Sequence, residues 1–198
     1  MTEQRPRQAP GAEKTATRAL TQSIVMIGLM GAGKTSVGTR LAAMLGAGFI
    51  DSDHEIEAAA GRTIAEIFEE FGEPYFRAGE RRVISRLLSG PPKVIATGGG
   101  AFMDAETRGV ILAEAVSVWL RADLDVLVAR TAGRTHRPLL NSGDPREILS
   151  GLIDARYPIY AEADVAVDSQ LGQTHEQMAA RIIAALEAEG RAFAGAVS

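Results

Sequence analysis

One stretch of the chain has the composition of a phosphate-binding loop. It reads GLMGAGKT over residues 28–35 and matches the pattern G-x-x-x-x-G-K-[ST], between an apolar run and a helical pattern. Glycines let successive backbone N–H groups turn toward phosphate oxygens, and the helix N-terminus adds partial positive charge. The lysine is expected to reach the β- and γ-phosphates of a nucleotide, and the threonine hydroxyl to hold Mg²⁺. The predicted phosphate-binding residues are Gly28, Met30, Gly31, Ala32, Gly33, Lys34, Thr35 and Ser36.

Two aspartates follow the next short apolar run. Asp51 and Asp53 are two positions apart, so in an extended chain both carboxylates would point to the same side. One could orient Mg²⁺ through water, and the other could accept a proton from a substrate hydroxyl. The alternative is helix capping, because Ser52 or Asp53 is a good N-cap for a helix over residues 54–60. The neighbouring phosphate loop favours the catalytic interpretation.

Three consecutive glycines, Gly98 to Gly100, follow a third apolar run. Glycine allows backbone to approach a ligand closely, but a flexible turn explains the pattern equally well. This strand lacks the acidic residue that many P-loop ATPases place at its end, which argues against a motor or switch ATPase.

Three arginines, Arg77, Arg137 and Arg156, are candidates for binding anionic groups. A carboxylate on a substrate calls for a planar bidentate donor, which Arg77 or Arg156 would supply, although a lone helical arginine is usually solvated. Arg137 lies in a segment rich in Gly, Pro and Arg that is predicted to be a mobile loop. An arginine on such a loop could close over the γ-phosphate and stabilise the transition state. The alternative for Arg137 is a surface charge.

Apolar runs alternate with helical patterns along the chain. Strands are expected at residues 23–29, 49–50, 94–97, 116–120 and 165–167. Helices are expected at 34–45, 54–60, 73–88, 104–114, 123–131 and 145–160, and capping boxes at Thr63 and Thr174 start two more. Strands that alternate with helices predict an α/β three-layer sandwich, with a five-stranded parallel sheet and helices on both faces. Ligands bind at the carboxyl ends of such strands, so the motifs should converge on one site.

Composition excludes several classes of protein. The formal net charge is −4, so a broad basic face for nucleic acid is not expected. The chain has no cysteine, which rules out a disulfide scaffold or a thiolate nucleophile. The three histidines show no metal-ligand spacing. No apolar run approaches the ~20 residues of a membrane span, and no signal sequence is evident. We therefore expect a cytoplasmic protein that does not bind membranes.

The polar composition at the two ends predicts the domain limits. Residues 1–21 are rich in Pro, Gly, Thr, Ala, Gln and charge, and we expect a disordered tail. A single P-loop domain is expected over residues 22–190, with a mobile loop at about 131–146 and a frayed end at 191–198.

Together these motifs resemble the shikimate kinase family. The segments GLMGAGKT, FIDSD, GRTIAEIFEEFGEPYFRAGE, TGGGA, RTHRPLL and ARYPIYAEAD occur in that order and span nearly the whole predicted domain. The first is shared with many nucleotide enzymes, whereas FR-x-x-E, GGG and RPLL in this order are much more specific. The resemblance implies a fold similar to that of nucleoside monophosphate kinases, with a lid. It also implies ATP- and Mg²⁺-dependent phosphorylation of the 3-hydroxyl of shikimate, in aromatic amino-acid biosynthesis.

The resemblance further implies a role for each matching position. Residues 28–35 would bind the phosphates of ATP, and Asp51 would support Mg²⁺ through water. Asp53 would contact the shikimate hydroxyls and act as a base or orienting group. Arg137 would be the lid arginine, and Arg130 would stack near adenine. The residues implied to surround shikimate are Asp53, Phe68, Phe76, Arg77, Glu80, Gly98, Gly99, Gly100 and Arg156, with Glu80 holding Arg77 in place.

Two other functions are weighed against this one. A kinase for another small acid, such as gluconate, would share the phosphate loop and a carboxylate-binding arginine but need not keep FR-x-x-E with GGG. A regulatory nucleotide-binding module would be expected to lack Lys34, Asp53 or the arginines, all of which are present. Binding of a partner through the tail rests on composition alone. We expect a monomer whose partners are the small molecules ATP and shikimate.

Overall fold

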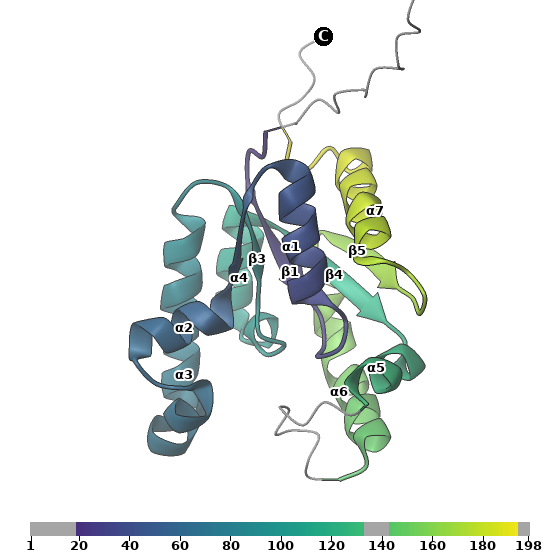
Figure 1. Ribbon diagram of the computed structural model, residues 1–198. Helices are drawn as coiled ribbons and strands as arrows, with labels where there is room; N and C mark the ends of the chain where they lie inside the picture. Colours follow the sequence, from purple (N-terminus) through teal and green to yellow (C-terminus); the bar gives the residue numbers. More distant parts are fainter. Residues whose placement is uncertain (1–18, 133–142, 194–198) are drawn as a thin grey trace, which may run out of the picture.

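A five-stranded parallel sheet forms the centre of the molecule (Figure 1). The computed structural model describes residues 19–132 and 143–193. The strands are β1 (Ser23–Ile27), β2 (Gly48–Asp51), β3 (Lys93–Ala96), β4 (Ala115–Ala122) and β5 (Val165–Ser169), in the spatial order β2-β3-β1-β4-β5. Every residue of the central strand β1 is buried, as expected for a strand covered on both faces. The predicted sheet is confirmed.

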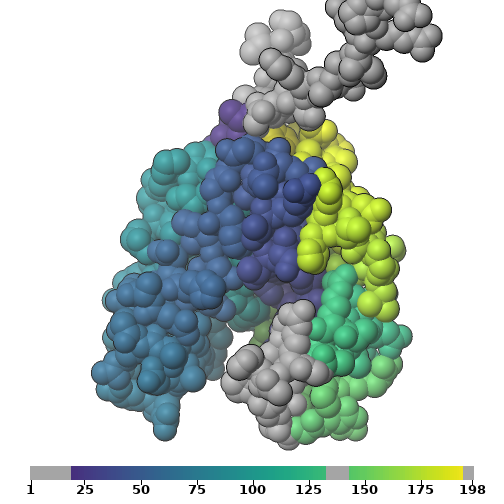
Figure 2. All heavy atoms as spheres, viewed as in Figure 1, coloured from purple at the N-terminus to yellow at the C-terminus, as the bar shows by residue number. Residues whose placement is uncertain are grey.

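Helices cover both faces of this sheet. They are α1 (Lys34–Leu45), α2 (Ser52–Ala60), α3 (Ile64–Leu88), α4 (Ala105–Glu114), α5 (Leu124–Thr131), α6 (Pro145–Tyr160) and α7 (His175–Ala188), with a 3₁₀ helix η1 (Ala101–Met103). Helices α1 and α7 pack together on one face, and α4 lies on the other (Figure 1). Helices α2 and α3 form a lobe, drawn in blue at the lower left of Figure 1 and Figure 2.

Local signals place several helix ends correctly. Both predicted capping boxes form. In each, the side chain of one residue bonds the backbone N–H of the other, between Thr63 and Glu66 and between Thr174 and Gln177. Gly72, with φ of 79°, kinks α3, so the separate helix predicted to begin at residue 73 is the second arm of one bent element. Within the part of the chain that the structure describes, no helix is both long and apolar enough to cross a membrane.

The capping alternative for the aspartate pair is wrong. The N-cap of α2 is Asp51, whose carboxylate accepts a hydrogen bond from Asp53 N at 3.1 Å, and not Ser52 or Asp53. The strand turns directly into the helix at Ser52, so Asp53 lies in a first helical turn rather than in extended chain. Asp123 stands at the start of α5, but its side chain makes no capping hydrogen bond.

Residues 133–142 of the predicted lid, with Arg137, and most of the two predicted tails lie outside the described residues. At the two ends of the predicted lid, Thr131 is the last residue of α5 and Pro145 the first of α6. The domain limits therefore remain predictions. In the described parts of the two predicted tails, Leu20 and Phe193 form an antiparallel bridge, and Thr21 N donates to Ala192 O at 2.8 Å.

Candidate active site

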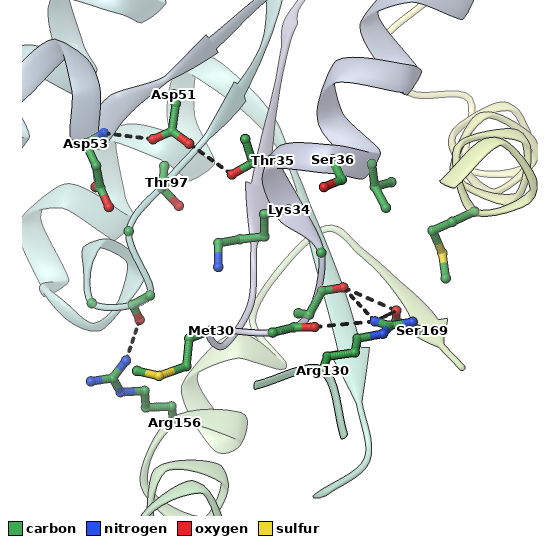
Figure 3. Close-up of a pocket in the computed structure, with 18 of the residues that line it drawn as sticks. Met30, Lys34, Thr35, Ser36, Asp51, Asp53, Thr97, Arg130, Arg156 and Ser169 are labelled. Atoms are coloured by element: carbon green, nitrogen blue, oxygen red, sulfur yellow. Dashed lines mark hydrogen bonds between the residues drawn. The ribbon is translucent and has the colours of Figure 1, made fainter. Parts of the chain in front are cut away.

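A pocket of about 620 Å³ opens at the carboxyl ends of β1, β2 and β3 (Figure 3). It brings together the phosphate loop, the two aspartates after β2 and the three glycines after β3, as the strand-end rule predicts. The predicted site residues that line it are Met30, Gly31, Ala32, Gly33, Lys34, Thr35, Ser36, Asp51, Asp53, Phe68, Phe76, Arg77, Glu80, Gly98, Gly99, Gly100, Arg130 and Arg156. Two predicted site residues are not among them: Gly28, described next, and Arg137, which lies outside the described residues.

The phosphate loop joins β1 to α1 through backbone that only glycine adopts readily. Gly33, the residue before α1, has φ of 101°, so the first turn of the helix opens toward the pocket. Gly28 does not line the pocket; a Cβ there would lie 2.8 Å from Leu120 O, so this glycine lets the loop pass close to β4. The Lys34 ammonium donates to Gly28 O at 2.7 Å and to Leu29 O at 3.2 Å. The loop therefore presents N–H groups and one cation to the same space.

Oxygen ligands for a divalent cation lie next to this loop. Thr35 Oγ1 donates to Asp51 Oδ2 at 3.0 Å, which holds the hydroxyl and the carboxylate side by side (Figure 3). Mg²⁺ is usually bound by one or two protein oxygens together with waters and substrate phosphates. Among the described residues no group of three or more His, Cys, Asp or Glu could hold a metal by itself. The donor set thus fits Mg²⁺ carried in with a nucleotide, and not a resident metal cage.

Asp53 has the properties of a group that accepts a proton. Burial, followed by the nearby charge of Asp51, raises the pKa of Asp53, while Lys34 opposes the shift. Asp53 Oδ1 has no hydrogen-bond partner among the residues that the structure describes. A Cβ on Gly98 would come within 2.8 Å of that oxygen, so glycine there leaves room for the carboxylate. A partly buried carboxylate with a raised pKa and an unused oxygen is suited to general-base work.

Two guanidinium groups lie at the same end of the pocket. Arg77 NH1 donates to Glu80 Oε2 at 2.6 Å, and its Nε and NH2 reach Glu73 Oε1 at 3.2 and 3.1 Å. Glu80 therefore contacts Arg77 as the resemblance implies. A Cβ on Gly100 would fall 2.3 Å from Arg77 NH2, so any other residue there would displace the guanidinium from its present position. Arg156 NH1 donates to Gly99 O at 3.0 Å (Figure 3).

Glu80 is an acidic residue held in the interior, 1% exposed. Burial raises its pKa to about 6, against the opposing effect of Arg77, and the charges of Asp53 and Asp104 add to the rise. The charged form of Glu80 is thus costly in the folded protein, although it is paired.

This shift predicts a pH-dependent contribution to stability. The folded protein keeps the Glu80 proton up to about pH 6, whereas the unfolded chain releases it near the usual 4.5, so protonation favours folding in this window. The wild type should therefore lose about 2 kcal/mol relative to Glu80→Gln as pH rises from 4.5 to 7. Urea unfolding at both pH values measures this difference. Glu73→Gln, which alters the exposed partner of Arg77, is the control and should retain the wild-type pH dependence. If Glu80→Gln lost as much unfolding free energy as the wild type between pH 4.5 and 7, Glu80 would not be the group responsible.

Arg130 joins the phosphate loop to the segment after β5. Its NH1 donates to Ala32 O at 3.2 Å and to Ser169 Oγ at 2.8 Å, and its NH2 donates to Gln170 O at 2.8 Å. Arg130 therefore lies at the nucleotide end of the pocket. Stacking of Arg130 near adenine stays a prediction.

Several pocket residues were not predicted from the sequence. They are Val37, Ile64, Thr97, Ser169, Gly172, Gln173, Thr174, His175 and Met178. The capping box at Thr174 indicated only a helix start, and the strand expected to stop at residue 167 runs on to Ser169. The strand-end rule, applied to β5, could have pointed to Ser169.

The fold and the pocket define a P-loop kinase, with a phosphate loop at one end and two arginines at the other. The family model described as shikimate kinase matches residues 30–187. The shikimate kinase of Paramagnetospirillum magneticum is 60% identical over 166 residues, 84% of this chain and 83% of the relative, and that of Caulobacter vibrioides is 56% identical over 162 residues, 82% and 80% of the two chains. The chain belongs to the shikimate kinase family.

A solved structure agrees with the sequence comparisons. The structure of shikimate kinase from Acinetobacter baumannii in complex with shikimate superposes with a TM-score of 0.77 at 38% identity, over 84% of this chain and 93% of that one.

Proposed function

We propose that this protein transfers the γ-phosphoryl group of ATP to the 3-hydroxyl of shikimate, giving shikimate 3-phosphate and ADP, as a step of aromatic amino-acid biosynthesis. One observation carries the proposal: a phosphate loop, a carboxylate with an unused oxygen and two guanidinium groups line a single pocket. A phosphate loop alone would bind a nucleotide, and the two arginines in the same pocket favour an anionic acceptor. Membership of the shikimate kinase family supports shikimate as that acceptor.

The pocket residues divide the work of an in-line transfer. The loop N–H groups and Lys34 hold the ATP phosphates, while Arg77 and Arg156 take the carboxylate of the acid. Asp53 accepts the hydroxyl proton as the hydroxyl oxygen bonds to the γ-phosphorus and the bond to the β–γ bridging oxygen breaks. ADP leaves with that oxygen, and the proton passes from Asp53 to water. Positioning and charge stabilisation supply most of the catalysis in such a step.

Mg²⁺ is the proposed cofactor. Thr35 would bind it directly and Asp51 through water, and when bound it would neutralise charge on the phosphates. Arg137, outside the described residues, is proposed as the lid arginine, and Arg130 as the residue beside adenine. We further propose a cytoplasmic monomer, as expected from the sequence.

The deciding experiment measures ADP release from ATP and Mg²⁺ with shikimate, with gluconate, with both acids and with neither. Strong release that depends on shikimate, unaffected by gluconate and abolished by EDTA, is expected. Release that depends on gluconate instead would keep the P-loop kinase and replace the acceptor. ATP binding without stimulated release by either acid would favour the regulatory-module alternative.

A further inference from the structure

Tyr160, the last residue of α6, is a buried polar side chain that the proposed reaction does not use. It is 0% exposed and does not line the pocket. Its hydroxyl nevertheless donates to Gly99 O, a carbonyl of the pocket wall. Burial raises the pKa of Tyr160, so the phenol remains a neutral hydrogen-bond donor at physiological pH.

Arg156 donates to the same carbonyl, at 3.0 Å. Arg156 and Tyr160 are four residues apart on α6, a spacing that places two side chains on one face of a helix. A carbonyl oxygen has two lone pairs and can accept both bonds. The Gly99 carbonyl oxygen thus accepts two hydrogen bonds, and both donors lie on the same face of α6.

Side chain and backbone atoms from both sides pack closely around Gly99. A Cβ there would lie 3.1 Å from Arg156 NH1 and 3.7 Å from the Tyr160 hydroxyl. The same Cβ would lie 3.5 Å from Gly28 O, in the phosphate loop. Gly99 is therefore enclosed between the loop that holds the nucleotide and the helix that carries the acid-binding arginine.

The ring of Tyr160 is fixed by other aromatic side chains. Ring centroids of Trp119, Tyr157 and Phe102 lie 6.1, 6.2 and 6.5 Å from it. A hydroxyl on a ring held in this way has little freedom, and it sets the place of the carbonyl that it bonds. Without the hydroxyl, Gly99 O would keep only the bond from Arg156. The carbonyl could then shift, and the Arg156 guanidinium bonded to it would change its orientation.

We propose that Tyr160 is a positioning residue for the acid substrate, acting through Gly99 O to orient Arg156 without touching the substrate. This rests on the proposed function, because it takes the anionic acceptor to be bound by Arg156. The proposal separates the two ends of the pocket: loss of the Tyr160 hydroxyl should weaken binding of the acid and leave binding of ATP unchanged.

Tyr160→Phe tests the proposal, since it removes one oxygen and keeps the ring. Loss of one of the two hydrogen bonds to Gly99 O predicts about a 3- to 10-fold rise in KM for shikimate and in its calorimetric Kd. The KM for ATP should stay within about twofold. Tyr157→Phe is the matched control, because its hydroxyl also bonds a backbone carbonyl, that of Ala122, but away from the pocket. It should leave both constants unchanged.

A double-mutant cycle shows whether Tyr160 acts through Arg156. The effect of Tyr160→Phe should shrink in an Arg156→Lys background, because residues that act together are not additive. An unchanged KM for shikimate in Tyr160→Phe, an equal rise in Tyr157→Phe, a rise in both KM values, or full additivity would each overturn the inference. Wild-type protein that does not phosphorylate shikimate would instead refute the proposed function, so the two failures are distinguishable.

Discussion

Replacing Asp53 with asparagine should lower kcat by about 10²- to 10⁴-fold, the range that a general base contributes. Asparagine has nearly the same shape but cannot accept the hydroxyl proton. The KM for ATP should change little, because the nucleotide is held by the phosphate loop. Steady-state rates with shikimate varied at saturating ATP measure the effect. The wild-type rate should also fall as pH is lowered through the raised pKa of Asp53, since the base must be deprotonated.

The matched control for this variant is Asp154→Asn, an exposed aspartate on α6. It should retain wild-type turnover. If Asp53→Asn keeps its kcat within about threefold, Asp53 is not the base, and the carboxylate serves only to orient the substrate. A fall in ATP affinity of the same size as the fall in kcat would indicate that the substitution disturbs the phosphate loop.

Arg77→Lys should raise the KM for shikimate about 10- to 100-fold while the KM for ATP stays within about twofold. Lysine keeps the positive charge beside buried Glu80 but loses the planar fork that matches a carboxylate. Loss of one charge-assisted hydrogen bond, about 1.5–3 kcal/mol, corresponds to that range. Titrating shikimate in the coupled ADP assay and by calorimetry gives both constants.

Arg82→Lys provides the control, because Arg82 lies on the same helix and is exposed. It should be indistinguishable from the wild type. An unchanged KM for shikimate in Arg77→Lys would remove Arg77 from the acid-binding group. A parallel rise in the KM for ATP would point to a distortion of the whole pocket rather than to a lost contact with the acid.

The phosphate loop and the helix after it were predictable because their signals are local. The helix expected over residues 34–45 has those limits in the structure, since Gly33 and Gly46 end it at both sides. The convergence of the loop, the aspartates and the triple glycine also followed from sequence, because parallel strands end at one edge of a sheet. The cap of α2 was mispredicted because Asp51, at the strand end, reaches the Asp53 N–H before either candidate cap does.

Interactions between distant parts of the chain were not predictable in the same way. Tyr160 has the pattern of an ordinary core aromatic, and only the fold shows that its hydroxyl meets Gly99, 61 residues away. Arg130 likewise finds its acceptors 39 and 98 residues away. Such contacts depend on which elements the sheet order brings together, and neither spacing nor composition encodes them.

The aromatic packing around Tyr160 gives the molecule a built-in optical probe. The chain has one tryptophan, and Trp119 is buried at 4% exposure, edge-on to Tyr157 at 4.9 Å and 6.1 Å from Tyr160. Its intrinsic emission therefore originates between α6, the helix that carries Arg156, and β1, whose Ile27 is its partner in the sheet. Fluorescence excited at the indole band thus reports, without a label, on how β4 packs against α6.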